Sequence, residues 1–176
     1  MNVKWVMVLS LGTLVAAGPA TLLAQTHHTR SPYAGQFSPS APIRALSPEE
    51  VRQIAAGEGA GMAKAAELNG VPGPRHVLDM ASGLDLTPAQ RGKIQAIYDD
   101  MHARAVIVGK GYLSAQEALE RDFRANRLTA ATLAKRVADV NRIRGDLETV
   151  HLTAHLATAR VLTPHQIAHY NKMRGY

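Results

Sequence analysis

The chain has 176 residues, a formal net charge of +6 and no cysteine, and 46% of its residues are hydrophobic. This length is enough for one domain with a packed core, and the lack of cysteine excludes disulfide bonds and a lipid-anchored cysteine. A basic protein favours acidic partners. However, 14 acidic residues dilute the 20 basic ones, which argues against a nucleic-acid-binding protein.

Residues 1–24 are predicted to be a signal peptide that is not part of the fold. Lys4 precedes an apolar run over residues 5–17, and the small residue Ala24 offers a cleavage point. The alternative is an uncleaved N-terminal anchor, because residues 5–24 carry no charge and approach the ~20 residues that span a bilayer. Under both interpretations the rest of the chain is exported.

Residues 25–45 are predicted to form a disordered tether, because they are rich in Ser, Pro, Thr and Gln and contain no acidic residue. If cleavage follows Ala24, the new N-terminus would begin Gln25-Thr26-His27. Its amine, two deprotonated amides and the His27 imidazole would give the square-planar nitrogen ligation that Cu(II) and Ni(II) favour. A different N-terminus would abolish this candidate metal site.

Residues 46–176 are predicted to form a single helical domain, in which three helix starts share one pattern. The three copies are Leu46-Ser47-Pro48-Glu49-Glu50, Leu86-Thr87-Pro88-Ala89-Gln90 and Leu162-Thr163-Pro164-His165-Gln166. In each copy a Ser or Thr can cap free backbone N–H groups, Pro takes the first helical position, and a Glu or Gln can complete a capping box. Thr87, Gln90, Thr163 and Gln166 are therefore interpreted as helix-capping residues.

The spacing of apolar residues in the rest of the domain predicts an all-α fold. Short helices are expected over residues 48–56, 62–68 and 75–82. Two long helices follow, one from 88 to about 125 and one after Thr129, with apolar residues alternately three and four apart. They would form a long antiparallel hairpin with short flanking helices. Gly109 and Gly111 each cost about 1 kcal/mol in a helix, so a kink or a complete break is expected there.

Histidine is the main chemical signal of the sequence, with eight residues in the chain. His151 and His155 are four residues apart, so both imidazoles lie on one helix face, with Glu148 on the same face. Folding the hairpin near residue 127 makes facing residue numbers sum to about 254, which brings His102 and Asp99 opposite this pair. These five residues are a candidate site for Zn²⁺, Ni²⁺ or Cu²⁺.

The alternative for these histidines is structural packing, in which each ring bonds a backbone carbonyl or a carboxylate. His165 and His169 form a second pair with the same spacing. His76, near a helix start, is interpreted as structural. The sequence contains no Gly-x-Ser-x-Gly elbow, no His-Glu-x-x-His motif and no Cys nucleophile. We therefore predict a non-enzymatic protein without an organic cofactor.

A basic region is predicted at the hairpin tip. It is interpreted either as a solvated face or as a cationic surface that attracts acidic or unfolded polypeptides. Its members are Arg121, Arg124, Arg127, Lys135, Arg136, Arg142 and Arg144.

The two Leu-Thr-Pro-x-Gln boxes, together with the ending 170–175 and the export signal, resemble the LTxxQ proteins of the bacterial periplasm, the Spy/CpxP-like superfamily. That superfamily includes ATP-independent chaperones and heavy-metal sensor or resistance proteins. The resemblance implies a periplasmic homodimer, attached to the inner membrane if the signal is not cleaved. It supports two hypotheses: a metal-binding envelope-stress protein, or a chaperone for unfolded or acidic envelope proteins. A membrane signalling protein is a further possible partner.

Overall fold

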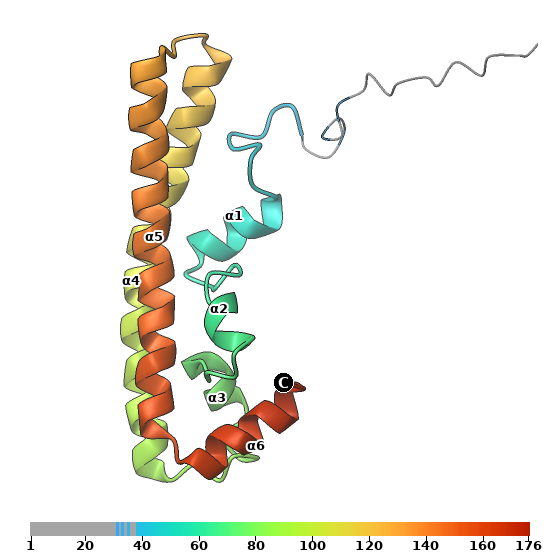
Figure 1. Ribbon diagram of the computed structural model, residues 1–176, viewed down its shortest axis with the longest axis vertical. Helices are drawn as coiled ribbons and strands as arrows, with labels where there is room; N and C mark the ends of the chain where they lie inside the picture. The colour runs from blue at the N-terminus through green and yellow to red at the C-terminus, as the bar shows by residue number, and fades with distance from the viewer. Residues whose placement is uncertain (1–30, 32, 34, 36–37) are drawn as a thin grey trace, which may run out of the picture. The chain divides into compact units, whose positions relative to one another are not determined.

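The computed structural model describes residues 31, 33, 35 and 38–176, so the predicted signal peptide or anchor and His27 lie outside the described residues. The described part contains six α-helices and no strand, as the sequence predicted (Figure 1). No helix within it is long and apolar enough to cross a membrane. The helices are α1 (Pro48–Ala55), α2 (Lys64–Glu67), α3 (Pro74–Asp79), α4 (Pro88–Arg124), α5 (Ala130–Val161) and α6 (Pro164–Arg174).

Helices α4 and α5 form the predicted antiparallel hairpin and bury the apolar seam between them (Figure 1). Met101 and Ala105 of α4 pack in one core cluster with Leu147 and Val150 of α5. The predicted register is correct. A methyl group on Gly111 would lie 3.8 Å from Cγ2 of Ile143, so these two residues face each other across the hairpin. Their residue numbers, 111 and 143, sum to the predicted 254. The seam is well buried up to Tyr112 and loosens towards the tip, where Phe123 and Val137 are exposed.

Helix α4 continues without interruption through Gly109 and Gly111, so the complete break considered from the sequence does not occur. Gly109 is buried against α1, and a Cβ atom there would lie only 2.6 Å from the carbonyl oxygen of Ile54. The helix-propensity cost of this glycine is therefore offset by the close approach of α1, which buries Ile54.

The three predicted capping boxes are present, at Ser47, Thr87 and Thr163. A fourth box, between Thr129 and Thr132, starts α5. The two short helices α2 and α3 are shorter than the predicted ranges 62–68 and 75–82. Neither has a side-chain cap at its start, and turns take up the remaining residues of the two ranges.

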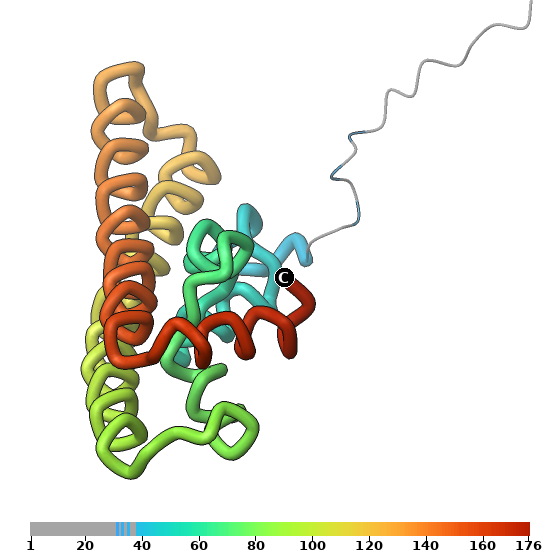
Figure 2. Tube along the Cα trace, turned by 60° about the horizontal axis from the view of Figure 1, so that its bottom comes forward, coloured from blue at the N-terminus to red at the C-terminus, as the bar shows by residue number. Residues whose placement is uncertain are grey.

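The segment that carries α1, α2 and α3, residues 46–85, packs along one side of the hairpin, and we call it the short-helix layer. Helix α1 contacts α4, and α3 contacts both α4 and α5. A second apolar cluster joins Val77 and Leu84 of this layer to Ile94, Leu162 and Tyr170. Figures 1 and 2 show the layer on one side of the hairpin and no helix on the opposite side. The layer therefore covers one hairpin face only.

The segment just before the layer was predicted to belong to the disordered tether. Residues 38–45 contain turns and bends but no helix. Ile43 is nevertheless buried, Arg44 forms an ion pair with Glu120 (Nε to Oε1, 2.6 Å), and Arg124 donates to the carbonyl oxygen of Ala41. These contacts attach residues 41–44 to α4 near the hairpin tip.

Candidate functional site

The two LTxxQ boxes meet at the base of the hairpin, where they do more than cap their own helices. Within each box, the Thr side chain accepts a hydrogen bond from the Gln backbone N–H, and the Gln Oε1 accepts one from the Thr backbone N–H. In addition, Gln90 Nε2 lies 2.8 Å from Gln166 Oε1, and Gln166 Nε2 lies 3.2 Å from Gln90 Oε1. The two side-chain amides therefore bind each other across 76 residues of sequence.

The same two side-chain amides also donate hydrogen bonds to backbone carbonyl oxygens of other segments of the chain. Gln90 Nε2 donates to the carbonyl oxygen of Val161 at 3.0 Å, and Gln166 Nε2 donates to that of Leu84 at 3.1 Å. A Glu at either position could complete a capping box but could not donate these bonds. The Gln–Gln contact thus explains why these two boxes end in Gln, whereas the isolated box of α1 ends in Glu50.

A histidine-lined hollow of about 660 Å³ lies between the short-helix layer and the hairpin. Four of the eight histidines line it: His76 from α3, His102 from α4, and His151 and His155 from α5. Carboxylates of Glu58, Glu67 and Asp79 also line this hollow. The i, i+4 spacing of His151 and His155 places both rings in it, as their shared helix face predicted.

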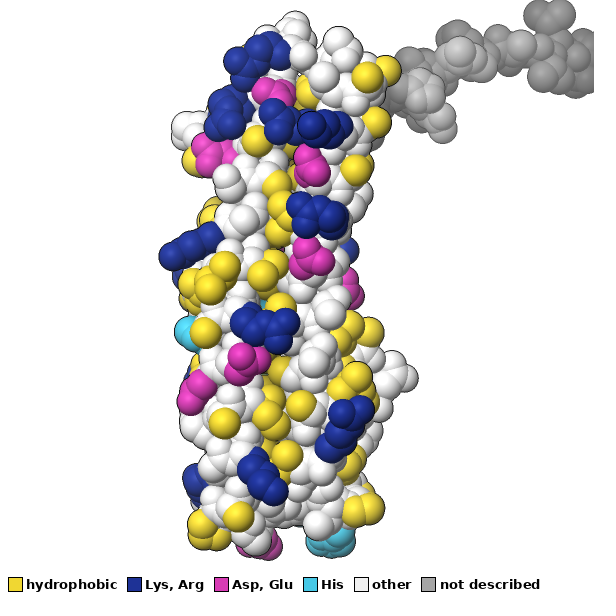
Figure 3. Space-filling view, turned by 90° about the vertical axis from the view of Figure 1, so that its left-hand side faces the viewer, with side chains coloured by type: hydrophobic (Ala, Val, Ile, Leu, Met, Phe, Trp, Pro, Cys, Tyr) yellow, Lys and Arg dark blue, Asp and Glu magenta, His cyan; other side chains and the backbone are white. Residues whose placement is uncertain are grey.

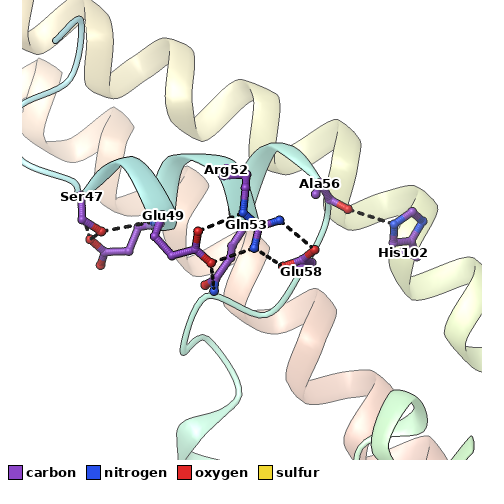
Figure 4. A network of polar contacts seen from close by, with 8 residues as sticks. Ser47, Glu49, Arg52, Gln53, Ala56, Glu58 and His102 are labelled. Atoms are coloured by element: carbon purple, nitrogen blue, oxygen red, sulfur yellow. Dashed lines mark hydrogen bonds and ion pairs between the residues drawn. The ribbon is translucent and has the colours of Figure 1, made fainter. Parts of the chain in front are cut away.

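Two of these histidines hold the layer against the hairpin through backbone carbonyls. His102 donates from Nε2 to the carbonyl oxygen of Ala56 at 2.9 Å (Figure 4). His155 donates from Nδ1 to that of Val71 at 2.8 Å. The structural alternative considered from the sequence therefore describes one ring nitrogen of each of these two histidines.

The pKa values of the other two histidines, His151 and His76, are lowered mainly by burial. Desolvation by burial lowers the pKa of His151, and the neighbouring His155 lowers it further. Desolvation also lowers the pKa of His76, although Glu67 acts in the opposite direction. His151 is 3% exposed, and its Nε2 atom is buried without a hydrogen-bond partner.

The five metal ligands predicted from the sequence are only partly brought together. His102, His151 and His155 share the hollow, but Asp99 is exposed and accepts a hydrogen bond from Gln95, while Glu148 lies 3.9 Å from Arg144. Across the described residues, no group of three or more His, Asp or Glu side chains is arranged as it stands to hold a metal ion. Metal binding stays a prediction, and sequence reasoning missed His76 because only the fold brings α3 to α5.

The predicted basic tip is largely neutralised. Residues 117–148 contain seven basic and six acidic side chains. The predicted basic region covers only residues 121–144 and so leaves out carboxylates one helical turn beyond its ends. Six of the seven cations form an ion pair: Arg121–Glu117, Arg124–Glu120, Arg127–Asp122, Arg136–Asp122, Arg142–Asp146 and Arg144–Glu148. This part of the hairpin is therefore a mixed-charge surface instead of a strongly cationic one.

The uncovered side of the hairpin carries an apolar groove between α4 and α5, which we call the open face (Figure 3). It consists of two hollows of about 290 and 380 Å³ that share Arg104 and Val150. Ile107, 71% exposed, lines the second hollow. The other lining residues are Ala96, Ile97, Asp100, Met101, Val108, Asp146, Thr149, Thr153, Ala154 and Ala157.

Comparison with known proteins identifies the class to which this arrangement belongs. A family model described as LTXXQ motif family protein matches residues 73–174, which include both boxes, the hairpin and α3. The chain therefore belongs to the LTXXQ motif family, within the Spy/CpxP-like superfamily. Proteins of this family are generally periplasmic and are known as non-enzymatic, which indicates an exported protein. The comparisons with curated proteins and with solved structures gave no match.

Proposed function

We propose that this protein is a non-enzymatic periplasmic chaperone that holds partly unfolded polypeptides on the open face of its hairpin. The observation that carries this proposal is the apolar groove on the side that the short-helix layer leaves uncovered. A large exposed apolar side chain next to a continuous apolar groove is typical of a surface that contacts other polypeptides.

The chemistry of the groove favours apolar segments over acidic ones. Its floor is made of aliphatic side chains and Met101, and its charges have both signs. Arg104 lies 3.5 Å from Asp100, and Asp146 lies 3.2 Å from Arg142. Paired charges at the rim keep the surface soluble without attracting one charge type. The ion-paired hairpin tip supports the same conclusion, so recognition of acidic clients is not proposed.

The shallow groove suits holding and release. Covering an exposed aliphatic side chain contributes about 1.5–3 kcal/mol, and much of this gain is offset by the ordering of both partners. Each contact is therefore weak, and a client would exchange without an energy source. The homodimer that the family resemblance implies stays a prediction, and a second copy on this face would compete with clients.

A pair of matched variants tests the proposal. Ile107 and Leu68 are 71% and 70% exposed, but Ile107 lines the open face whereas Leu68 lies in the short-helix layer. We expect Ile107→Asp to reduce suppression of light scattering by an aggregating, chemically unfolded client in the absence of ATP. Leu68→Asp should leave it unchanged. Equal loss in both variants, or no suppression by the wild-type protein, would contradict the proposed function.

A further inference from the structure

The geometry points to a second polypeptide-binding surface, on the covered side of the hairpin, which α1 occupies in this structure. The surface fits a short amphipathic helix with one aliphatic anchor, because that is the element seated on it. The inference rests on the proposed function in that both surfaces would hold polypeptide segments. It goes beyond that function because it makes α1 a displaceable cover, which limits how much of the hairpin is available to clients.

The surface under α1 is shaped to receive a helix. Gly109 of α4 is buried at the closest approach, where a Cβ atom would lie 2.6 Å from the carbonyl oxygen of Ile54. Ala105, one helical turn earlier on α4, is fully buried. Because the side chains at a helix contact set how closely two helices can approach, these small residues let the backbone of α1 lie directly on α4.

A single aliphatic side chain anchors α1 on this surface. Ile54 is 2% exposed and belongs to the same core cluster as Met101, Ala105 and Tyr112 of α4. It is the one buried residue among the eight of this helix, all of which the structure describes. A helix that places an apolar anchor in a groove is a recurring mode of peptide recognition. Helix α1 is therefore seated as a bound peptide would be.

The charged side chains of α1 bond within their own segment (Figure 4). Ser47 and Glu50 form the capping box, and Arg52 forms ion pairs with Glu49 at 2.7 Å and with Glu58 at 3.2 Å. Within the described part of the chain, every ion pair of α1 has both members in residues 49–58. The helix can therefore leave the hairpin without breaking its cap or its ion pairs.

Polar contacts on either side of α1 position it on α4. His102 donates to the carbonyl oxygen of Ala56 at 2.9 Å, and Arg44 forms an ion pair with Glu120 at 2.6 Å. The Arg44 side chain is 46% exposed, and an ion pair with that much solvent contact contributes little. The apolar anchor is therefore the main attachment, and a client segment that supplies another anchor can replace it.

The chain that follows α1 is built as a hinge. It reads Gly57-Glu58-Gly59-Ala60-Gly61, and Gly57 and Gly61 have φ angles of 70° and 79°. Glycine adopts such angles without strain and can also leave them, so this segment can absorb the backbone rotation that releases α1. The attachment of α3 to both hairpin helices lies beyond the hinge, so α1 can open while α3 stays in place.

The cover also selects which clients reach the surface. Because α1 belongs to the same chain, its effective concentration at the surface is high, as for any short tether. A client segment with one weak anchor does not compete with it. A segment with several apolar anchors does, so the second surface opens for polypeptides that expose much apolar side-chain area.

The release variant is Ile54→Asp, which replaces the anchor by a carboxylate. Since the chain has no cysteine, pairs of engineered cysteines can carry spin labels at exposed positions. A pair at Ala55 and Arg160 reports the distance from α1 to α5, and a pair at Ser114 and Arg160 reports the hairpin itself. We expect Ile54→Asp to lengthen and broaden the first distance and to leave the second unchanged. If the hairpin pair changes, Ile54→Ala serves as the release variant.

Client holding is then measured with the same chemically unfolded client as before, in the wild-type and Ile107→Asp backgrounds. Adding Ile54→Asp should increase suppression of light scattering in both, and in the second it should restore the suppression that Ile107→Asp removes. The matched control is Leu68→Asp, which changes an exposed residue of the short-helix layer and should restore nothing.

The inference is overturned if α1 is released but the Ile107→Asp background gains no suppression, if Leu68→Asp restores it equally, or if α1 stays seated without its anchor. These outcomes are separate from failure of the proposed function. That failure is read from Ile107→Asp alone, whereas the gain on release of α1 is read against its own parent in each background.

Discussion

Individual side chains in this protein often serve two purposes, and Gln90 and Gln166 show this most clearly. Each completes the capping box of its own helix and also bonds the other amide and a distant carbonyl oxygen. The start of α4 and the start of α6 are thereby held together by the same atoms that cap them. The LTxxQ pattern thus encodes a tertiary contact as well as two helix starts.

Gln90→Glu should destabilise the protein by about 1–3 kcal/mol, because the carboxylate keeps the capping bond but cannot donate to Gln166 and Val161. The matched control is the reverse change, Glu50→Gln, in the isolated box of α1. There only the charge at a helix N-terminus is lost, which costs less than about 1 kcal/mol. Urea unfolding of both variants measures the difference, and equal effects would mean that the Gln–Gln contact contributes nothing.

Gly109→Ala should also destabilise the protein, although alanine is the better helix former. The new methyl group would lie 2.6 Å from the carbonyl oxygen of Ile54 and would push α1 away, at a cost of about 1–3 kcal/mol. Gly92 and Gly145 are helical glycines at which an added methyl group would have nothing within 4 Å, so alanine there should stabilise by up to about 1 kcal/mol. Thermal melts of the three variants test this, and stabilisation by Gly109→Ala would contradict the close approach of α1.

Among the elements, the hairpin tip depends on Asp122, which joins the end of α4 to the turn and to α5. Its carboxylate accepts hydrogen bonds from Arg136 at 2.8 Å and Arg127 at 2.9 Å. These bonds, that from Arg136 first, hold the pKa of Asp122 below its ordinary value of 3.8. The predicted cationic tip is therefore held together by the carboxylates within it.

The lowered pKa gives a pH dependence with a definite sign. The folded state holds the proton of Asp122 less tightly than the unfolded state does. The ionised Asp122 carboxylate therefore stabilises the folded protein fully above pH ~4, and this stabilisation is lost as the pH falls through the lowered pKa. We expect the stability difference between wild type and Asp122→Asn to shrink below pH ~4 in urea unfolding. A difference that stays constant down to the lowest pH at which the protein folds would show that the ion pairs are not formed.

Residue spacing and capping patterns along the sequence predicted the helices well, but they predicted the contacts between distant elements poorly. The apolar seam, the capping boxes and the hairpin register depend on residue spacing and turn position, which the sequence carries directly. The position of His76 in the hollow and the contact between Gln90 and Gln166 depend on how the layer and α6 fold back. Residue spacing also predicted that Asp99 lies opposite His155. In the structure Asp99 is exposed, because it lies on the solvent-facing side of α4.

At the scale of the whole molecule, the hairpin has two different sides. One is covered by the short-helix layer and contains the histidine-lined hollow, and the other carries the open face. A change on one side can therefore be made without removing residues from the other.

The most direct measurement is site-specific photo-cross-linking to an unfolded client. A benzophenone side chain at Thr153, which is exposed and lines the open face, is compared with one at Arg52, which is exposed on α1. If clients are held on the open face, position 153 should give efficient cross-links to the client and position 52 few. Equal cross-linking from both positions, or cross-links from position 153 only to a second copy of the chain, would contradict client holding on the open face.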